Sequence, residues 1–196
     1  MNSPRRWELA GGATLTFDPH WLGASEADRV LRAHLEEIEW KQRTIRIMGR
    51  DVLQPRLSAW YGDAAYTYSG VTLRPLPWTP LLAELRDRVI AAVGERFNSV
   101  LCNLYRTGSD SMGLHADDEK ELGPNPVIAS VSLGATRRLV LRHKKRRAAP
   151  LHLDLTSGSL LVMGPGTQTF WRHEVPKDAQ AAGPRVNLTF RRIVPS

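Results

Sequence analysis

The stretch R-V-N-L-T-F-R at residues 185–191 alternates between polar and apolar side chains. Successive side chains of a β-strand point to opposite faces, so this stretch predicts a strand with one polar and one apolar face. The polar face carries Arg185, Asn187, Thr189 and Arg191. Such a face ordinarily meets solvent. Two arginines beside an amide and a hydroxyl also suit a small dianion, because a guanidinium binds a carboxylate through two parallel hydrogen bonds.

Other β-rich runs come before this strand, with no helical pattern between them. Because strands follow strands, an antiparallel sandwich or barrel is favoured over a parallel sheet. The runs cover residues 99–105, 127–133, 137–143, 150–155 and 158–163, and the last strand extends to about residue 193.

Two helices are predicted upstream of these strands. The first runs from Ser25 to about Glu39, with a capping box formed by Ser25 and Asp28. The second is capped by Thr79 and ends near Phe97. The predicted fold class is α+β, with two supporting helices on a jelly-roll core, a double-stranded β-helix.

The composition is that of one globular domain of 196 residues. Its single cysteine excludes an internal disulfide and a cysteine-based zinc site. No apolar run approaches the roughly 20 residues of a membrane helix, and the first residues lack the apolar stretch of a secretory signal. We therefore expect a cytoplasmic monomer that does not enter a membrane.

The net charge of +7 is unevenly distributed. Residues 1–100 contribute +1 and residues 101–196 contribute +6. Such a surface favours a polyanionic partner such as nucleic acid, although solubility alone could also explain it.

A metal site is predicted from three residues. His115 and Asp117, in G-L-H-A-D-D-E, would point to the same face of an extended strand. His173, in F-W-R-H-E, lies at the edge of another β segment. Two histidines and one carboxylate form the facial triad of non-haem iron oxygenases, which leaves positions open for co-substrate and oxygen. An H-x-D pair alone is more often part of a solvated loop. The polar strand at 185–191 and the same-face pair Asn103 and Tyr105 give it weight.

Together, H-x-D…H and R-x-N-x-T-x-R resemble the signature of the AlkB family of nucleic-acid dealkylases. The resemblance covers residues 40–193 and is greatest to the branch that acts on duplex DNA. It is carried by Q-P-R-L-S-A-W-Y-G-D at 54–63, Y-T-Y-S-G at 66–70, N-L-Y at 103–105, G-L-H-A-D-D-E at 113–119, I-A-S-V-S-L-G at 128–134, G-S-L-L-V-M at 158–163 and P-R-V-N-L-T-F-R at 184–191.

The resemblance implies a DNA repair dioxygenase that uses Fe(II), 2-oxoglutarate and O2. It would hydroxylate an N-alkyl carbon on bases such as N1-methyladenine and N3-methylcytosine, and release succinate, CO2, an aldehyde and the free base. The implied iron ligands are His115, Asp117 and His173. Arg185 would bind the distal carboxylate of 2-oxoglutarate and Arg191 would lie near the carboxylate that is lost. The rest of the co-substrate pocket would comprise Asn103, Tyr105, Asn187 and Thr189.

The resemblance also implies a nucleotide-recognition region at about 40–76, forming a lid over a catalytic core at about 98–193. Met48 matches a finger that is inserted into the base stack. A thioether stacks less well than the usual aromatic ring, so we expect a preference for single-stranded or locally open substrates. The other implied substrate residues are Arg50, Tyr61, Gly62, Asp63, Tyr68, Asp118 and Glu119. The basic run R-H-K-K-R-R at 142–147 would clamp phosphates, unless it is only a solvated hairpin tip.

Two other functions fit parts of the sequence. One is a hydroxylase with the same cofactors that acts on RNA, a protein or a small molecule; a protein or small molecule would not need the aromatic and basic surface. The other is a nucleic-acid-binding module without catalysis, which the intact triad and both arginines disfavour.

Overall fold

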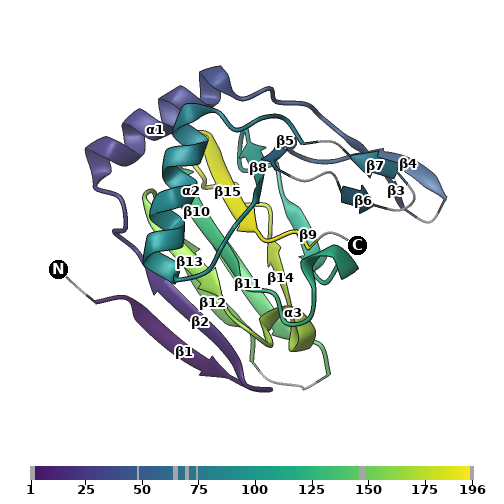
Figure 1. The fold of residues 1–196 in the computed structure, drawn as a ribbon. Coiled ribbons are helices and arrows are strands. Elements are labelled where there is room, and N and C mark those ends of the chain that lie inside the picture. The colour runs from purple at the N-terminus through teal and green to yellow at the C-terminus, as the bar shows by residue number, and fades with distance from the viewer. Residues whose placement is uncertain are drawn as a thin grey trace.

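Two antiparallel sheets face each other in a computed structural model, which describes residues 3–47, 49–63, 66–68, 71–73, 75–145 and 149–194 (Figure 1). Within these residues the larger sheet has the strand order β1-β2-β13-β10-β15-β8-β5, and the smaller sheet has the order β12-β11-β14-β9. The larger sheet comprises β1 (Arg5–Leu9), β2 (Ala13–Asp18), β5 (Leu57–Gly62), β8 (Ser99–Tyr105), β10 (Ile128–Gly134), β13 (Ser159–Met163) and β15 (Arg185–Arg191). The smaller comprises β9 (Met112–His115), β11 (Arg137–His143), β12 (Leu151–Leu155) and β14 (Trp171–Val175).

The chain crosses repeatedly between the two sheets. After β10 it enters the smaller sheet as β11 and β12, returns as β13, crosses again as β14 and ends as β15. This alternation is the connectivity of a jelly roll. The predicted α+β class with a jelly-roll core is therefore confirmed.

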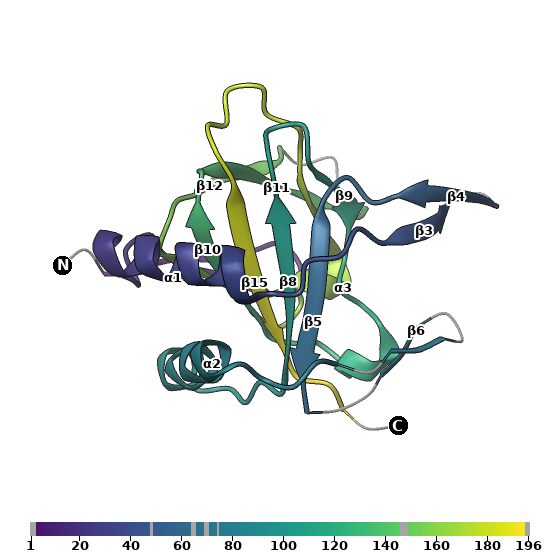
Figure 2. The same ribbon diagram turned by 90° about the horizontal axis from the view of Figure 1, so that it is seen from above.

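Two helices, α1 (Ala24–Glu37) and α2 (Pro80–Val93), cover the outer face of the larger sheet (Figures 1 and 2). Their apolar side chains pack on the apolar face of β15, whose Val186, Leu188 and Phe190 are fully buried. The buried residues of α2 are Leu82, Leu85 and Val89. The outer face of β15 is therefore sealed by the helices, which leaves its polar face to point between the sheets.

The helix boundaries agree with the sequence only in part. The Thr79 side chain accepts a hydrogen bond from the N–H of Leu82, as predicted for a cap. The capping box of Ser25 and Asp28 is wrong, because α1 begins after Gly23 and its cap has no side-chain hydrogen bond. Both helices also end earlier than predicted. In α2 the reason is Gly94, whose left-handed backbone (φ 78°) closes the last turn.

Two small hairpins project from the side of the body that carries β9 (Figures 1 and 2). One consists of β3 (Thr44–Ile47) and β4 (Arg50–Leu53), and the other of β6 (Tyr66–Tyr68) and β7 (Val71–Leu73). Val52 and Leu53 are exposed on the first hairpin. Met48 lies outside the described residues, as does the Tyr68 side chain.

Within the described part of the chain, no helix is long and apolar enough to cross a membrane.

His34 is a buried histidine of α1 that makes no hydrogen bond through either ring nitrogen. Burial lowers the pKa of His34 from 6.5 to about 4. Between these values the unfolded chain binds a proton that the folded chain does not, so stability is lost as the pH falls through this window.

A His34→Leu variant should lose this part of the pH dependence. Between pH 6.5 and pH 4, the free energy of unfolding of the wild type should fall by about 3 kcal/mol more than that of the variant. Urea unfolding at a series of pH values measures the difference. Parallel curves for the two proteins would show that His34 is not the group responsible.

Candidate active site

Three ligand groups meet between β9 and β14. His115 ends β9 and is the direct register partner of His173 in β14. Asp117 lies beyond the end of β9, and its Oδ1 is 3.5 Å from His115 Nε2. One ligand atom from each residue lies within 4.8 Å of the others, so the three can hold one metal ion. The placement of Asp117 corrects the prediction that both residues of H-x-D share a strand.

The surroundings hold Asp117 and His173 in the protonation states that suit metal ligands. Burial alone would raise the pKa of Asp117, but the positive charge of Arg191 and the hydrogen bond from His115 hold it well below its usual range. Burial and the nearby charge of His115 lower the pKa of His173 to about 4. An ionised carboxylate and a neutral imidazole are the forms that bind metal. His115 Nδ1 lies 2.8 Å from the carbonyl oxygen of Gly113, which leaves Nε2 for a ligand.

The triad opens into a cavity between the two sheets. Its walls come from strands of both sheets, with apolar side chains from β11, β12 and β13. The polar face of β15 therefore points inward and not to solvent. All nine residues predicted for metal and co-substrate line this cavity: Asn103, Tyr105, His115, Asp117, His173, Arg185, Asn187, Thr189 and Arg191.

Arg185 lies in this cavity with unused donors. Its side chain is 1% exposed, and its Nη2 donates to Ser132 Oγ at 2.9 Å. Its Nε and Nη1 have no hydrogen-bond partner, and the guanidinium carbon lies 5.1 Å from the centre of the Tyr105 ring. Leaving buried donors of a charged group unpaired is costly, so the site fits a carboxylate. The buried Nε of Arg191 is also without a partner.

The neutral polar residues of the cavity bond mainly to the protein. Asn187 donates to Ser130 Oγ and to the carbonyl oxygen of Val131, and its Oδ1 accepts from the Thr189 hydroxyl. Asn187 therefore helps to fix β15 against β10. Asn103 Oδ1 accepts from Arg56 Nε at 2.9 Å.

The predicted substrate strand faces the helical core. Tyr61 is buried, and its hydroxyl accepts from the N–H of Glu39. A side chain at Gly62 would clash with the carbonyl oxygen of Asn98. Asp63 accepts from Trp78 Nε1 at 2.8 Å. These three residues therefore do not join the residues that line the cavity. Trp60, in the same strand, is also buried.

The remaining substrate residues lie in different settings. Asp118 is exposed and pairs with Lys144 at 3.0 Å. Glu119 is partly buried, its Oε2 has no partner, and burial raises its pKa. Arg50 is exposed on β4.

Sequence reasoning missed two buried residues near the site. Arg137 is 1% exposed and donates to the carbonyl oxygens of Asp110 and Pro176. It therefore links the loop after β8 to the loop after β14. Its place among the apolar, inward-facing residues of a predicted strand could have identified Arg137 as a buried arginine. Gln168 accepts from the N–H of Asp117, and the sequence held no local signal of it.

Comparisons with known proteins agree with this site. The family model of the 2OG-Fe(II) oxygenase superfamily matches residues 14–191. The chain is 44% identical to the DNA oxidative demethylase ALKBH2 of Mus musculus, over 89% of this chain and 78% of that one. It is 43% identical to the alpha-ketoglutarate-dependent dioxygenase alkB homolog 3 of Homo sapiens, over 94% and 68%.

The solved structure of OsALKBH1 superposes with a TM-score of 0.62 and covers 96% of this chain and 100% of that one. At 17% identity this likeness supports the fold alone. From the family model and the relatives, the chain belongs to the 2OG-Fe(II) oxygenase superfamily and, within it, to the AlkB family.

Proposed function

We propose that this Fe(II)- and 2-oxoglutarate-dependent dioxygenase repairs DNA by oxidative removal of N-alkyl groups from its bases. The observation that carries the proposal is one cavity that holds both a metal triad and a buried arginine with unused donors. Relatives at 43–44% identity, named as a DNA oxidative demethylase and an alkB homolog dioxygenase, support the substrate class.

The residues of the cavity would have separate roles in the reaction. Bound Fe(II) supplies the activation of oxygen. Arg185 would bind the distal carboxylate of 2-oxoglutarate bidentately, beside the Tyr105 ring. Arg191 Nη2, 3.0 Å from Asp117 Oδ2, would stand next to both the metal and the carboxylate that is lost. Leu139, Leu155 and other apolar walls would limit water around the reaction.

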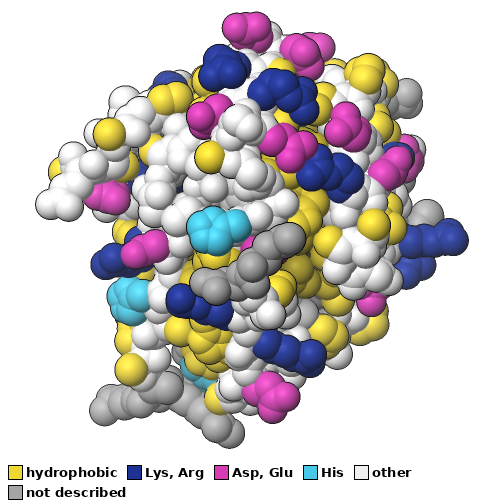
Figure 3. Space-filling view, turned by 90° about the vertical axis from the view of Figure 1, so that its left-hand side faces the viewer, with side chains coloured by type: hydrophobic (Ala, Val, Ile, Leu, Met, Phe, Trp, Pro, Cys, Tyr) yellow, Lys and Arg dark blue, Asp and Glu magenta, His cyan; other side chains and the backbone are white. Residues whose placement is uncertain are grey.

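Nucleic acid would be recognised on the side of the molecule with the two projecting hairpins. They lie within the proposed recognition region at 40–76, on the side of β9 and its metal ligand. Asp118 and Glu119 follow the metal ligand Asp117 in the chain and suit cationic bases such as N1-methyladenine and N3-methylcytosine. On the opposite side, which carries α1 and β1, basic and acidic side chains are intermixed (Figure 3). That face offers less to a polyanion.

We propose that only part of the basic run at 142–147 acts as a phosphate clamp. Arg142 pairs with Glu174 at 3.3 Å, and Lys144 is bonded within the protein. Lys145 is exposed, while Arg146 and Arg147 lie outside the described residues. The clamp would therefore rest on residues 145–147.

Replacing Lys145, Arg146 and Arg147 with glutamine should weaken binding to DNA of any sequence. Each lost phosphate contact should also reduce the slope of log affinity against log salt by about 0.9. Fluorescence anisotropy at several salt concentrations measures both quantities, and Arg138→Gln, on the exposed side of β11, serves as the control. An unchanged slope and affinity would leave the run as a solvated hairpin tip.

The substrate is tested with oligonucleotides that carry one N1-methyladenine or N3-methylcytosine. Single-stranded DNA, duplex DNA and RNA of the same sequence are each incubated with the protein, Fe(II), 2-oxoglutarate and air. Mass spectrometry then measures the fraction of each oligonucleotide that has lost the methyl group. The proposal expects demethylation of DNA, faster on the single strand than on the duplex. Demethylation of RNA but not of DNA would show that the substrate is RNA and not DNA. No demethylation of any of the three would refute the proposal.

A further inference from the structure

Asp117 is an iron ligand that is not held by the sheet. The strand ladder ends at His115, and Asp117 follows in irregular chain at 3% exposure. Buried backbone N–H groups need a partner, and here no strand supplies one. The N–H of Asp117 instead donates to Gln168 Oε1 at 2.9 Å.

Gln168 is itself fixed. It lies in the short helix α3 (Thr167–Phe170) at 1% exposure. Its Nε2 donates to Met163 Sδ at 3.5 Å, so its amide has one orientation, with Oε1 toward Asp117. Since α3 leads directly into β14, Gln168 joins the segment of Asp117 to the strand of His173.

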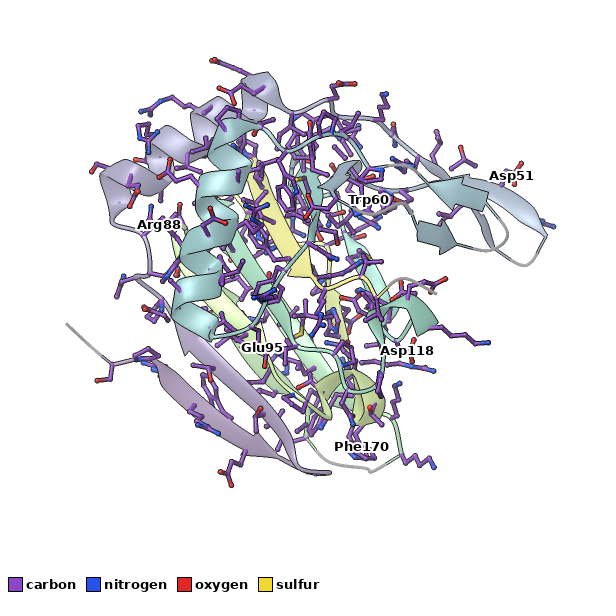
Figure 4. The ribbon with its side chains drawn as sticks, viewed as in Figure 1. Asp51, Trp60, Arg88, Glu95, Asp118 and Phe170 are labelled. Atoms are coloured by element: carbon purple, nitrogen blue, oxygen red, sulfur yellow. The ribbon has the colours of Figure 1, made fainter. Side chains whose placement is uncertain are left out.

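Lys144, which follows β11, ties the same two segments from outside. Its Nζ donates to the carbonyl oxygen of Gln168 at 2.8 Å and to Asp118 Oδ2 at 3.0 Å. Its backbone N–H donates to the carbonyl oxygen of Phe170 at 2.8 Å. Asp118 and Phe170, the last residue of α3, lie at the same end of the molecule (Figure 4).

We propose that Gln168 and Lys144 are the positioning residues of the iron ligand Asp117. Gln168 fixes the backbone of Asp117, and Lys144 holds α3 and Asp118 together so that this bond is kept. This assigns Lys144 to the iron site and not to a phosphate of the substrate. The proposal rests on Asp117 being an iron ligand, as the proposed function also requires.

The first test is the affinity for Fe(II) alone, measured by anaerobic calorimetric titration of the metal-free protein. Gln168→Met keeps the length of the side chain but loses the oxygen acceptor. Its dissociation constant should rise about 10- to 100-fold, as is usual when the partner of a metal ligand is removed. Gln168→Glu keeps an oxygen at the same position and should stay within about threefold of the wild type. Equal dissociation constants for Gln168→Met and the wild type would overturn the role of Gln168.

The second test uses two neighbouring lysines. Lys144→Met and Lys145→Met each remove one charge from the same hairpin, but only Lys144 contacts Asp118 and α3. The dissociation constant for Fe(II) should rise several-fold in Lys144→Met and stay unchanged in Lys145→Met. The affinity for unmethylated DNA should fall in Lys145→Met and change little in Lys144→Met. The opposite pattern would return Lys144 to the phosphate clamp.

Two controls separate the causes of failure. Thermal unfolding of the metal-free variants shows whether each is folded, and if Gln168→Met is not, the lysine pair decides alone. Asp117→Ala should lose most of its Fe(II) affinity. If Asp117→Ala binds Fe(II) like the wild type, the ligand assignment is wrong and the positioning role falls with it. If Asp117→Ala loses the metal while Gln168→Met and Lys144→Met do not, only the positioning role fails.

Discussion

Alanine at His115, Asp117 or His173 is expected to abolish succinate formation. Each substitution removes one of three ligand groups that lie within 4.8 Å of one another, and two remaining groups hold a divalent ion poorly. Asp117→Ala has a second effect, because it leaves the partly buried guanidinium of Arg191 without its counter-ion.

The measurement is 2-oxoglutarate turnover at saturating Fe(II), with the metal content of each variant determined in parallel. His152→Ala is the matched control, since His152 is exposed on β12. It should retain wild-type activity. Near-normal turnover in any one of the three triad variants would show that the residue is not a ligand.

Arg185→Lys is expected to raise the concentration of 2-oxoglutarate needed for half-maximal activity. The substitution keeps the charge but loses the planar fork that binds a carboxylate through two hydrogen bonds. The side chain is 1% exposed, so water cannot readily replace the missing donor. Loss of one charge-assisted hydrogen bond costs about 1.5–3 kcal/mol, which corresponds to a rise of about 10- to 160-fold.

The titration of 2-oxoglutarate is run on wild type, Arg185→Lys and the exposed control Arg138→Lys. DNA affinity should be the same in all three proteins, which separates a co-substrate effect from a substrate effect. An Arg185→Lys curve that coincides with the wild type would remove Arg185 from the co-substrate site.

The strands were predictable from the sequence, because their polar and apolar side chains alternate with a period of two residues. Strands β8 and β11 lie where they were predicted, and β10 and β15 differ only at their ends. The alternation at 185–191 also identified the pocket residues of β15. The sequence could not decide whether this face met solvent. Whether this face meets solvent depends on the smaller sheet, whose strands come from segments that lie far apart in the sequence.

The features that were missed depend on contacts between distant residues. Gly23, and not Ser25, is the N-cap of α1, because the chain enters the helix from a turn in which the N–H of Leu22 donates to the carbonyl oxygen of Gly158. The bond from Asp117 to Gln168 spans 51 positions and has no local pattern. The family resemblance predicts a substrate role for Tyr61, which the structure does not support. Its neighbours in β5 and the helices place it in the core.

The proposed repair function requires that this cavity couple 2-oxoglutarate oxidation to the demethylation of a base. The direct measurement is oxygen-dependent succinate formation by the full chain with Fe(II) and 2-oxoglutarate. It is compared for a DNA oligonucleotide that carries one N1-methyladenine and for the unmethylated oligonucleotide of the same sequence. We expect the methylated strand to stimulate succinate formation, with formaldehyde and unmodified adenine appearing at the same rate as the additional succinate. Equal succinate formation with both oligonucleotides, and no formaldehyde with either, would contradict the account.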